Sequence, residues 1–308
     1  MSERDSSRPR FLLLFVDGVG LAPAGASNPL ATAPMPAFRR LLGGRLTVES
    51  AQASAGLLLR PLDATLGVAG LPQSATGQTT LLTGVNAARE LGRHVSAFPG
   101  PRLAALLAAN SVLAGAGALG RSALFANPFT PRYFAEVAAR RRRLSATTLA
   151  ALAGRTPLRD LSDLERGEAV SWDVCRDHFA THLDQPIALV TAEEAGRQLA
   201  RLAGQHDFTL WETFMTDLAG HARWGWTAEE ALARLDGLLA GVLAARPEDL
   251  TVLLTSDHGN LEDATHPLHT RNPVPLLVVG PDAAAFAGIE SLDGVTPCLL
   301  ARFAVAPG

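Results

Sequence analysis

Three short apolar runs, each bounded by turn residues, most strongly constrain the fold of this 308-residue chain. They are FLLLFV at 11–16, TVLLT at 251–255 and VPLLVV at 274–279. A continuous run of branched and aromatic side chains is typical of a strand that is buried on both faces. Amphipathic segments at 192–204 and 227–245 predict helices. Strands that alternate with helices predict an α/β fold built on a layered sheet.

Proline, glycine and hydroxyl residues predict where further elements begin and end. We expect a short helix that ends at Gly43, and a helix that begins near Ser74 and runs through TTLLTG. The run PRLAALLAANSVLAG predicts one helix with Pro101 in its first turn. Thr227 is the expected N-cap of the helix that follows it. The segments RSALFANPF and DFTLWETF predict two more strands.

The segment 133–186 differs in character from its flanks. It contains four consecutive arginines, Arg140 to Arg143, then a helix-like stretch and a polar stretch. We expect a small, mostly helical, cap-like insertion here. It would divide a core made of 10–132 and 187–308, preceded by a disordered tail at 1–9. The arginines fit either a phosphate clamp or a solvated helix face.

Composition and charge argue against several classes of protein. Hydrophobic residues make up 47% of the chain and charged residues 19%, which suits a globular protein with a large core. The net charge of −3 provides no basic field for nucleic acid. No apolar run reaches the roughly 18 residues that cross a bilayer, and the polar N-terminus lacks signal-peptide features. With two cysteines, Cys175 and Cys298, we expect a cytoplasmic protein without a nucleic-acid or membrane partner.

Acidic and histidine residues cluster at the predicted strand ends, where open α/β sheets bind their ligands. Asp17 ends the first apolar run, and Asp257 and His258 end the second. Asp217 and His221 lie four residues apart, which places them on one face of a helical turn. Converging carboxylates repel one another unless a cation is present, so the pattern predicts a metal site. Mixed Asp and His ligands favour zinc or manganese.

Each of these patterns also has a purely structural interpretation. Asp17 before a glycine is typical of a strand-end turn, Asp217 and His221 of a surface pair, and Asp-His-Gly of a turn. Ser74 at a helix start is typical of a cap. The same position would also place a hydroxyl nucleophile beside an anion bound at the helix N-terminus. Only the occurrence of all these patterns together favours an active site.

The chain resembles the alkaline phosphatase superfamily, and most closely the metalloenzyme branch of cofactor-independent phosphoglycerate mutase and phosphopentomutase. The resemblance spans roughly 10–130 and 187–308. Counting nine residues back from Thr83 of LLTG, as in sulfatases, also leads to Ser74 as the nucleophile. The matching motifs are Asp17-Gly18, Ser74-Ala75-Thr76-Gly77-Gln78, Asp217 to His221, Asp257-His258-Gly259-Asn260 and His269-Thr270-Arg271-Asn272-Pro273-Val274-Pro275.

This resemblance implies a three-layer α/β/α sandwich with a largely parallel sheet and two divalent metal ions, Mn²⁺ or Zn²⁺. It further implies a phosphomutase-like enzyme that acts on a small-molecule phosphate ester through a phosphoserine. One ion would be held by Asp217, His221 and His269, and the other by Asp17, Asp257, His258 and the Ser74 oxygen. Further candidates for substrate contact or ligand support are Thr76, Gln78, Asn86, His94 and His266.

Two departures from the mutase pattern leave the phosphoryl acceptor open. Gln78 stands where both mutases carry histidine, and the segment 133–186 is much smaller than the phosphoglycerate mutase cap. A mutase must keep its intermediate from water, so a phosphomonoesterase or phosphodiesterase is the main alternative. A non-catalytic metal-binding protein is a second. A dinucleotide site is disfavoured because Pro23 occupies the third glycine position of GxGxxG.

Overall fold

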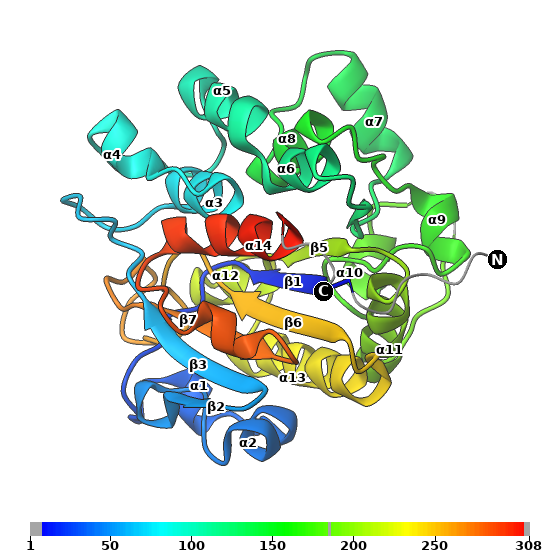
Figure 1. Cartoon of the computed structure of the whole chain (residues 1–308). Coiled ribbons are helices and arrows are strands. Elements are labelled where there is room, and N and C mark those ends of the chain that lie inside the picture. Colours follow the sequence, from blue (N-terminus) through cyan, green and yellow to red (C-terminus); the bar gives the residue numbers. More distant parts are fainter. Residues whose placement is uncertain (1–7, 184–185, 305–308) are drawn as a thin grey trace.

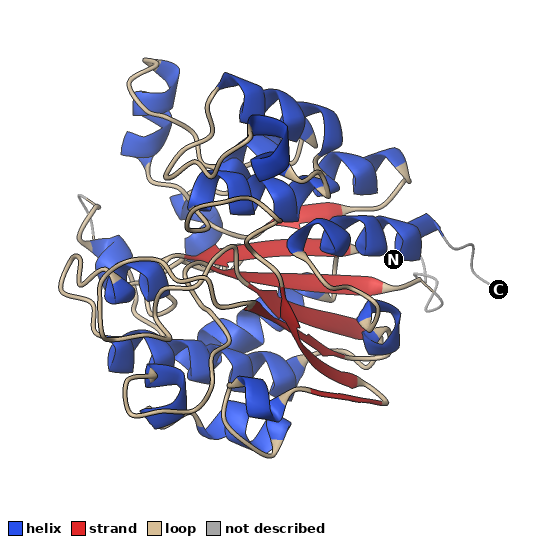
Figure 2. Cartoon of the chain, turned by 90° about the vertical axis from the view of Figure 1, so that its left-hand side faces the viewer, coloured by secondary structure: helices blue, strands red, loops and turns tan. Residues whose placement is uncertain are grey.

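The computed structural model describes residues 8–183 and 186–304, so most of the predicted tail at 1–9 lies outside the described residues. Within them, seven strands form one sheet in the order β2-β3-β7-β6-β1-β5-β4. The sheet is central to the molecule, and helices cover both of its faces (Figures 1 and 2). The strands are β1 (Arg10–Val16), β2 (Gln52–Ser54), β3 (Leu57–Leu62), β4 (Ala123–Phe125), β5 (Phe208–Thr213), β6 (Leu250–Thr255) and β7 (Val274–Val279).

Strand direction divides the sheet into two parts. β1 runs parallel to both β5 and β6, and β4 runs parallel to β5. β7 runs antiparallel to β6, and β3 and β2 continue the antiparallel pairing. The reversal of β7 has a local consequence: the segment that precedes β7 lies at the same sheet edge as the segments that follow β1, β5 and β6. The predicted, mostly parallel α/β sheet is therefore confirmed.

Alternate side chains of β1 point into two separate cores. Leu12, Leu14 and Val16 pack on the face covered by α1, α2, α11 and α13. Phe11 and Phe15 pack on the opposite face, against α3, α5, α6, α8 and α14. This period of two follows from the strand pleat and produces the expected α/β/α layers. The helices are α1 (Pro29–Thr32), α2 (Pro36–Leu42), α3 (Ser74–Thr83), α4 (Ala87–Leu91), α5 (Pro101–Asn110), α6 (Val112–Ala118), α7 (Pro131–Ala138), α8 (Ala146–Ala153), α9 (Leu161–Glu165), α10 (Asp177–Ala180), α11 (Ala192–Ala203), α12 (Met215–Gly220), α13 (Ala228–Ala245) and α14 (Val295–Ala304).

Local signals place most helix ends correctly, with one error. Gly43 ends α2 in the left-handed conformation, and the Thr227 side chain accepts from Glu230 N at the start of α13. The predicted single helix over PRLAALLAANSVLAG is wrong, because it breaks at Ser111 into α5 and α6. The Ser111 hydroxyl donates to Ala150 O in α8, and its oxygen caps α6. A contact distant in sequence thus ends the helix.

The segment 133–186 contributes to the layers as well as to the surface. α8 packs against α3, α5 and α6, and three of its alanines are buried in the same core as β1. Farther along, Trp172 stacks on Phe214, with ring centroids 4.1 Å apart. The division of the chain into a core and an insertion stays a prediction. No helix among the described residues is long and apolar enough to span a bilayer.

Close packing of α11 on α13 depends on glycine. A methyl group at Gly196 would overlap the Leu238 carbonyl of α13, whereas one at Gly117 in α6 would meet nothing within 4 Å. We expect Gly196→Ala to lower the free energy of unfolding by about 1–3 kcal/mol through overpacking. Gly117→Ala should raise it by up to about 1 kcal/mol by restricting the unfolded chain. Urea titration measures both, and equal stability of the two variants would contradict the packing assignment.

Candidate metal centre and active site

The predicted site residues meet at one edge of the sheet because their strands are neighbours. Val16 of β1 pairs with Thr213 of β5, and Phe15 pairs with Thr255 of β6. The chain therefore leaves all three strands at the same level. It then supplies Asp17 directly, Asp217 and His221 from α12, and Asp257 with His258. Because β7 runs in reverse, the loop before it brings His269 to this edge as well.

Asp217, His221 and His269 form the first cluster. Their ligand atoms all lie within 4.8 Å of one another. The Nε2 atoms of the two histidines are 3.1 Å apart, and Asp217 Oδ1 lies 3.4 Å from His221 Nε2. Nδ1 of His221 lies 2.7 Å from Pro267 O, and Nδ1 of His269 lies 2.8 Å from Pro72 O. Since each Nδ1 donates to a carbonyl, both Nε2 atoms present a lone pair to the cluster; that of His221 also lies 3.1 Å from the Asn260 amide nitrogen.

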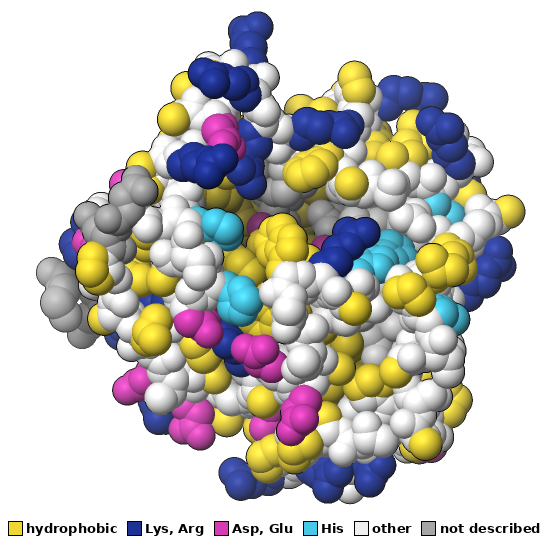
Figure 3. Space-filling view, turned by 180° about the vertical axis from the view of Figure 1, so that it is seen from behind, with side chains coloured by type: hydrophobic (Ala, Val, Ile, Leu, Met, Phe, Trp, Pro, Cys, Tyr) yellow, Lys and Arg dark blue, Asp and Glu magenta, His cyan; other side chains and the backbone are white. Residues whose placement is uncertain are grey.

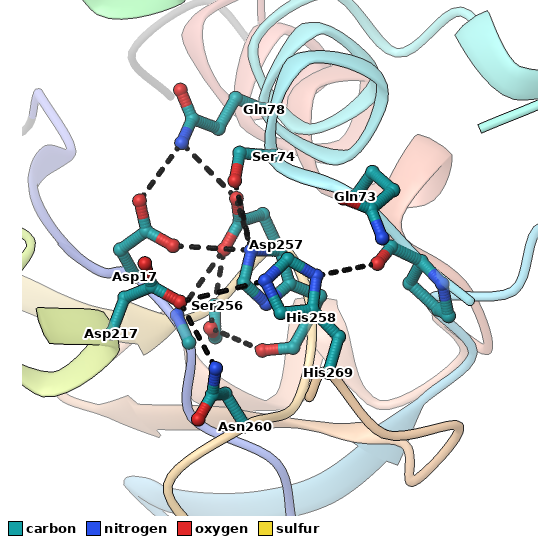
Figure 4. A network of polar contacts seen from close by, with 12 residues as sticks. Asp17, Gln73, Ser74, Gln78, Asp217, Ser256, Asp257, His258, Asn260 and His269 are labelled. Carbon is teal, nitrogen blue, oxygen red and sulfur yellow. Dashed lines mark hydrogen bonds and ion pairs between the residues drawn. The ribbon is translucent and has the colours of Figure 1, made fainter. Parts of the chain in front are cut away.

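Asp17, Asp257 and His258 form the second cluster, to which Ser74 is joined (Figure 4). The ring Nε2 of His258 lies 3.3 Å from Asp17 Oδ1 and 3.5 Å from Asp257 Oδ2. Ser74 Oγ lies 3.0 Å from the same nitrogen. Gln73 occupies the N-cap position of α3, so the Ser74 hydroxyl does not cap its own helix and instead faces the cluster. The rings of His258 and His269 stack at 3.7 Å, which brings the two clusters side by side.

The electrostatics of the two clusters favour a cation. Burial raises the pKa of Asp17 well above its usual range, and the charges of Asp257 and Asp217 raise it further. Burial opposes ionisation of Asp217 too, but its contact with the His221 ring and the charge of His258 hold its pKa low. Burial and the charge of His258 lower the pKa of His269, which keeps its ring neutral as a metal ligand requires.

The donor set fits divalent metal ions. The two Nε2 lone pairs, 3.1 Å apart, cannot satisfy each other, and a shared ion would satisfy both. Asp17 Oδ1 and Asn260 Oδ1 are buried without a hydrogen-bond partner among the described residues. A buried acceptor in that state is costly unless a cation or water meets it. Mixed carboxylate and imidazole ligands suit zinc or manganese.

Gln78, a candidate for ligand support from its motif, and Glu262, which the motifs did not indicate, both support the ligands. The Gln78 amide donates to Asp17 Oδ2 at 3.0 Å and to Asp257 Oδ2 at 3.1 Å. Glu262 is buried and accepts from Gly20 N and Asn260 N, both at 2.8 Å, and from the Thr270 hydroxyl. It thereby ties together the loops that follow β1, follow β6 and precede β7. The sequence signal that could have identified Glu262 was its position two residues after the Asp-His-Gly-Asn motif.

Helix α3 approaches the second cluster closely because Gly77 lacks a side chain. A methyl group at Gly77 would lie 2.5 Å from Asp257 O and 2.9 Å from Asp257 Cβ. Glycine is the residue that permits such an approach of two backbones. Gly77 therefore sets the distance at which Ser74 and Gln78, on the same helix, reach the cluster.

The other candidate residues have structural partners. Thr76 is fully buried, where it donates to Gln73 O and accepts from Val95 N. Asn86 caps α4 and donates to Leu66 O. His94 Nε2 lies 3.4 Å from Val68 O, and His266 pairs with Asp263 at 3.6 Å. Gln78 alone among the five is hydrogen-bonded to residues of the two clusters.

A pocket of about 390 Å³ opens onto the first cluster and Ser74. Three polar side chains that the motifs did not indicate lie in its wall, namely Gln73, Ser96 and Arg223. On one face of the molecule, histidine and arginine side chains lie next to each other among hydrophobic ones (Figure 3). The remaining lining residues are Leu71, Ser74, Ala97, Asp217, His221, Leu268 and His269.

The four consecutive arginines, Arg140 to Arg143, lie at the surface, and the two tryptophans that follow His221, Trp224 and Trp226, differ in exposure. All four arginines are exposed, Arg142 pairs with Glu136 at 2.8 Å, and the Arg143 guanidinium lies 5.7 Å from the Phe98 ring centroid. Trp224 is exposed, whereas Trp226 is buried beneath Arg234. Trp226 is therefore a core residue. Within 8–183 and 186–304, the four arginines form no ion pair or hydrogen bond with either cluster.

Glu212, near the end of β5, is a further ionisable group beside the clusters. Burial raises its pKa to about 7; a hydrogen bond from Thr147 opposes the shift, and the charge of Asp257 adds to it. Its charge also contributes to the raised pKa of Asp17. The sequence offered no sign of this, because Glu212 lies within a strand whose burial only the sheet determines.

A known family model matches the C-terminal part of the chain. Residues 188–307 match the family model described as the Metalloenzyme superfamily. A 2,3-bisphosphoglycerate-independent phosphoglycerate mutase from Serratia proteamaculans is 34% identical over 131 residues, which cover 40% of this chain and 25% of that protein. One from Coxiella burnetii is 34% identical over 92 residues, covering 27% and 18%. The matches thus span a quarter or less of these relatives' length.

Solved structures with the same fold cover nearly the whole chain. The alkaline phosphatase from the Antarctic bacterium TAB5 has a TM-score of 0.55 at 14% identity, covering 96% of this chain and 98% of that one. A cold-active alkaline phosphatase from Shewanella sp. has a TM-score of 0.52 at 12% identity, covering 96% and 100%. The C-terminal part of the chain is thus similar to the Metalloenzyme superfamily and to these mutases, and the whole chain has the fold of the alkaline phosphatases.

Removing one ligand should remove one ion. We expect His269→Ala to lower bound zinc or manganese by about one equivalent per chain, because the first cluster keeps only Asp217 and His221. His266→Ala is the matched control, since His266 pairs with Asp263 instead. Elemental analysis of purified protein measures both. Unchanged metal content in the His269 variant would contradict the ligand assignment.

Glu212 should make stability fall as pH rises. Because its folded-state pKa of about 7 exceeds the ordinary value of 4.5, its contribution is full below pH 4.5 and is lost as pH rises through 7. In chelator-treated protein, Glu212→Gln should flatten that decline by an amount on the order of 1 kcal/mol per pH unit. Unfolding titrations across this range measure it, with exposed Glu248→Gln as control. Parallel curves for all three proteins would refute the shift.

Proposed function

We propose that this protein is a metal-dependent phosphoryl-transfer enzyme that acts on a small-molecule phosphate ester through Ser74. One observation carries the proposal: Ser74 Oγ lies 3.0 Å from His258 Nε2, beside two clusters that fit metal ions, in the wall of a pocket. Ser74 is also the first residue of the ten-residue helix α3. The free N–H groups at a helix N-terminus favour a bound phosphate.

The residues then divide into three roles. Asp217, His221 and His269 would hold one ion, and Asp17, Asp257, His258 and Ser74 the other. Bound divalent ions, Mn²⁺ or Zn²⁺, supply Lewis-acid stabilisation of the phosphoryl charge. Ser74 Oγ forms the new bond to phosphorus while the bond to the leaving oxygen breaks, and the proton lost from the Ser74 hydroxyl is balanced by the one that the leaving alcohol gains, which yields a phosphoserine. Gln78 orients Asp17 and Asp257 through its amide.

The second ring nitrogens fix the histidines for this task. His221 and His269 each donate from Nδ1 to a backbone carbonyl, which sets both the tautomer and the ring orientation. These carbonyls belong to Pro267 and Pro72, and proline limits the motion of the backbone that carries them. The geometry is therefore arranged before substrate binds, as electrostatic catalysis requires.

What receives the phosphoryl group from Ser74 is the finer question. A phosphomutase-like enzyme returns it to the substrate, and a phosphatase gives it to water. One observation favours water: the residues that line the pocket all lie between 71 and 97 or between 217 and 269, and none of the described residues of 133–186 is among them. A pocket without a covering lid leaves the phosphoserine open to water. Release of inorganic phosphate, rather than its transfer within the substrate, identifies the hydrolase.

Loss of the nucleophile should stop turnover without emptying the metal sites. We expect Ser74→Ala to lower kcat at least roughly 1,000-fold, because no other route forms the covalent intermediate. Metal content should stay largely unchanged, since Asp17, Asp257 and His258 remain. Ser96→Ala, another hydroxyl in the pocket wall, should retain activity. Phosphate release from a panel of monoesters measures the effect, and full activity of the Ser74 variant would overturn the assignment.

A further inference from the structure

We propose that the protein docks on an anionic lipid bilayer with the mouth of the pocket, through three exposed apolar side chains and the arginines beside them. The inference goes beyond the proposed function, because it concerns the surface on which the protein works and not the reaction at Ser74. We call the three side chains, Phe98, Trp224 and Leu268, the apolar rim. They are 38%, 64% and 59% exposed, respectively.

All three members of the apolar rim lie at the pocket. Leu268 is part of its wall. Phe98 directly follows Ala97, which lines the pocket, and Trp224 directly follows a second lining residue, Arg223. Single exposed apolar side chains are ordinary on a protein surface, whereas a group of them around one opening is typical of an interaction site.

The backbone around the apolar rim is strained. Trp224 has a φ of +55°, and Ala97, which precedes Phe98, has a φ of +59°. The left-handed region is unfavourable for residues with a side chain, most of all for a bulky one, and such strain is typical of functional sites. Trp226, two residues beyond Trp224, is buried. The fold thus buries one tryptophan and holds the other in solvent.

The loops that carry the apolar rim are tied to the metal-binding elements. Val95, three residues before Phe98, accepts from Thr76 N at 3.3 Å and donates to the Thr76 hydroxyl at 3.2 Å. Thr76 lies on α3, the helix that begins at the candidate nucleophile. Leu268 directly precedes His269 of the first cluster. A surface that contacts the apolar rim therefore lies next to the site.

Positive charge is concentrated in the same part of the molecule. The segment 64–158 contains ten arginines, no lysine and two glutamates, a formal charge of +8 in a chain whose net charge is −3. In the part of the chain that the structure describes, the ion pairs of these arginines are those of Arg132 and Arg142 with Glu136. Basic side chains gather at the top of the molecule, over α4 and α7 (Figures 1 and 3). Such a patch attracts an anionic surface.

One contact joins this charge to the apolar rim. The Arg143 guanidinium lies 5.7 Å from the Phe98 ring centroid, and Arg140 to Arg143 are all exposed. An arginine can lay its apolar stem along a hydrophobic surface while its charge reaches a phosphate. Stable attachment to a membrane takes two signals, an apolar one and a polybasic one. The mouth of the pocket has both side by side.

The chemistry of the apolar rim favours lipid over nucleic acid. Single-stranded nucleic acid stacks its bases on aromatic rings, and the aliphatic Leu268 offers no ring for stacking. At a bilayer, by contrast, tryptophan lies at the level of the headgroups, and anionic headgroups attract arginine. The expectation of no membrane partner rested on segments that cross a bilayer, and a protein that lies on a bilayer needs none.

Co-sedimentation with vesicles tests the apolar part of the surface. We expect the protein to bind phosphatidylcholine vesicles that contain about 30% phosphatidylglycerol at least roughly 10-fold more tightly than vesicles of phosphatidylcholine alone. Trp224→Ala and Phe98→Ala should each weaken this binding roughly 5- to 10-fold, because less apolar surface enters the bilayer. Leu119→Ala and Leu152→Ala are matched controls, since both side chains are exposed but neither lines the pocket. They should bind like wild type.

The same assay tests the arginines. Arg141→Gln should weaken binding to the anionic vesicles about fivefold, the value of one basic side chain near such a surface. Exposed Arg40→Gln on α2, outside the arginine-rich segment, should change it little. Raising the salt from about 0.1 M to about 0.5 M should weaken the binding of wild type and reduce the difference between the two variants.

Tryptophan fluorescence gives a second measurement. The chain has four tryptophans, of which Trp224 is exposed and Trp172, Trp211 and Trp226 are buried. Anionic vesicles should therefore shift the emission to shorter wavelength as Trp224 leaves water. Trp224→Phe should abolish the shift yet keep most of the binding, because phenylalanine retains an apolar ring.

Three results would overturn the inference. Wild-type protein could remain in solution with every vesicle. Binding to a single-stranded oligonucleotide without binding to vesicles would assign the surface to nucleic acid. Self-association that Trp224→Ala abolishes, again without vesicle binding, would assign the apolar rim to a second copy of the chain. None of these measurements requires turnover, so the proposed function is judged separately, by phosphate release from monoesters.

Discussion

Repulsion among three carboxylates governs the design of this protein. Asp17, Asp217 and Asp257 converge at one sheet edge, and Asp257 is fully buried. Burial and mutual repulsion both work against their charge, as the raised pKa of Asp17 records. Divalent cations are the natural compensation, and the free imidazole nitrogens around the carboxylates complete suitable ligand sets. The surrounding fold can be understood as the frame that keeps these groups together.

That frame works by close approach and by shared hydrogen bonds. Gly77 lets α3 reach Asp257, so that one helix delivers both Ser74 and the Gln78 amide. Glu262 accepts donors from three loops and fixes their relative positions. Such buried acceptors stabilise a site only when their partners are all present.

Features of the fold that depend on neighbouring residues could be predicted from the sequence, and features that depend on residues far apart in the chain could not. Apolar runs predicted the buried strands, and local caps predicted the ends of α2 and α13, because those signals act over a few residues. The break at Ser111 was missed because its partner, Ala150, lies on another helix. Thr76 and Asn86 each donate a hydrogen bond to a backbone carbonyl, that of Gln73 and that of Leu66, so their suggested substrate contacts stay predictions.

The sequence by itself predicted the layered α/β architecture from its apolar runs and helices, and its motifs supplied the metal-ligand candidates through their resemblance to a known family. Only the tertiary structure decided which of these candidates come together in one cluster. Strand order made β1, β5 and β6 neighbours, and the reversal of β7 brought His269 to the same edge. The tertiary structure also turned Ser74 toward His258 and placed Arg223 in the pocket wall. These placements depend on contacts between residues far apart in the chain, which no local pattern encodes.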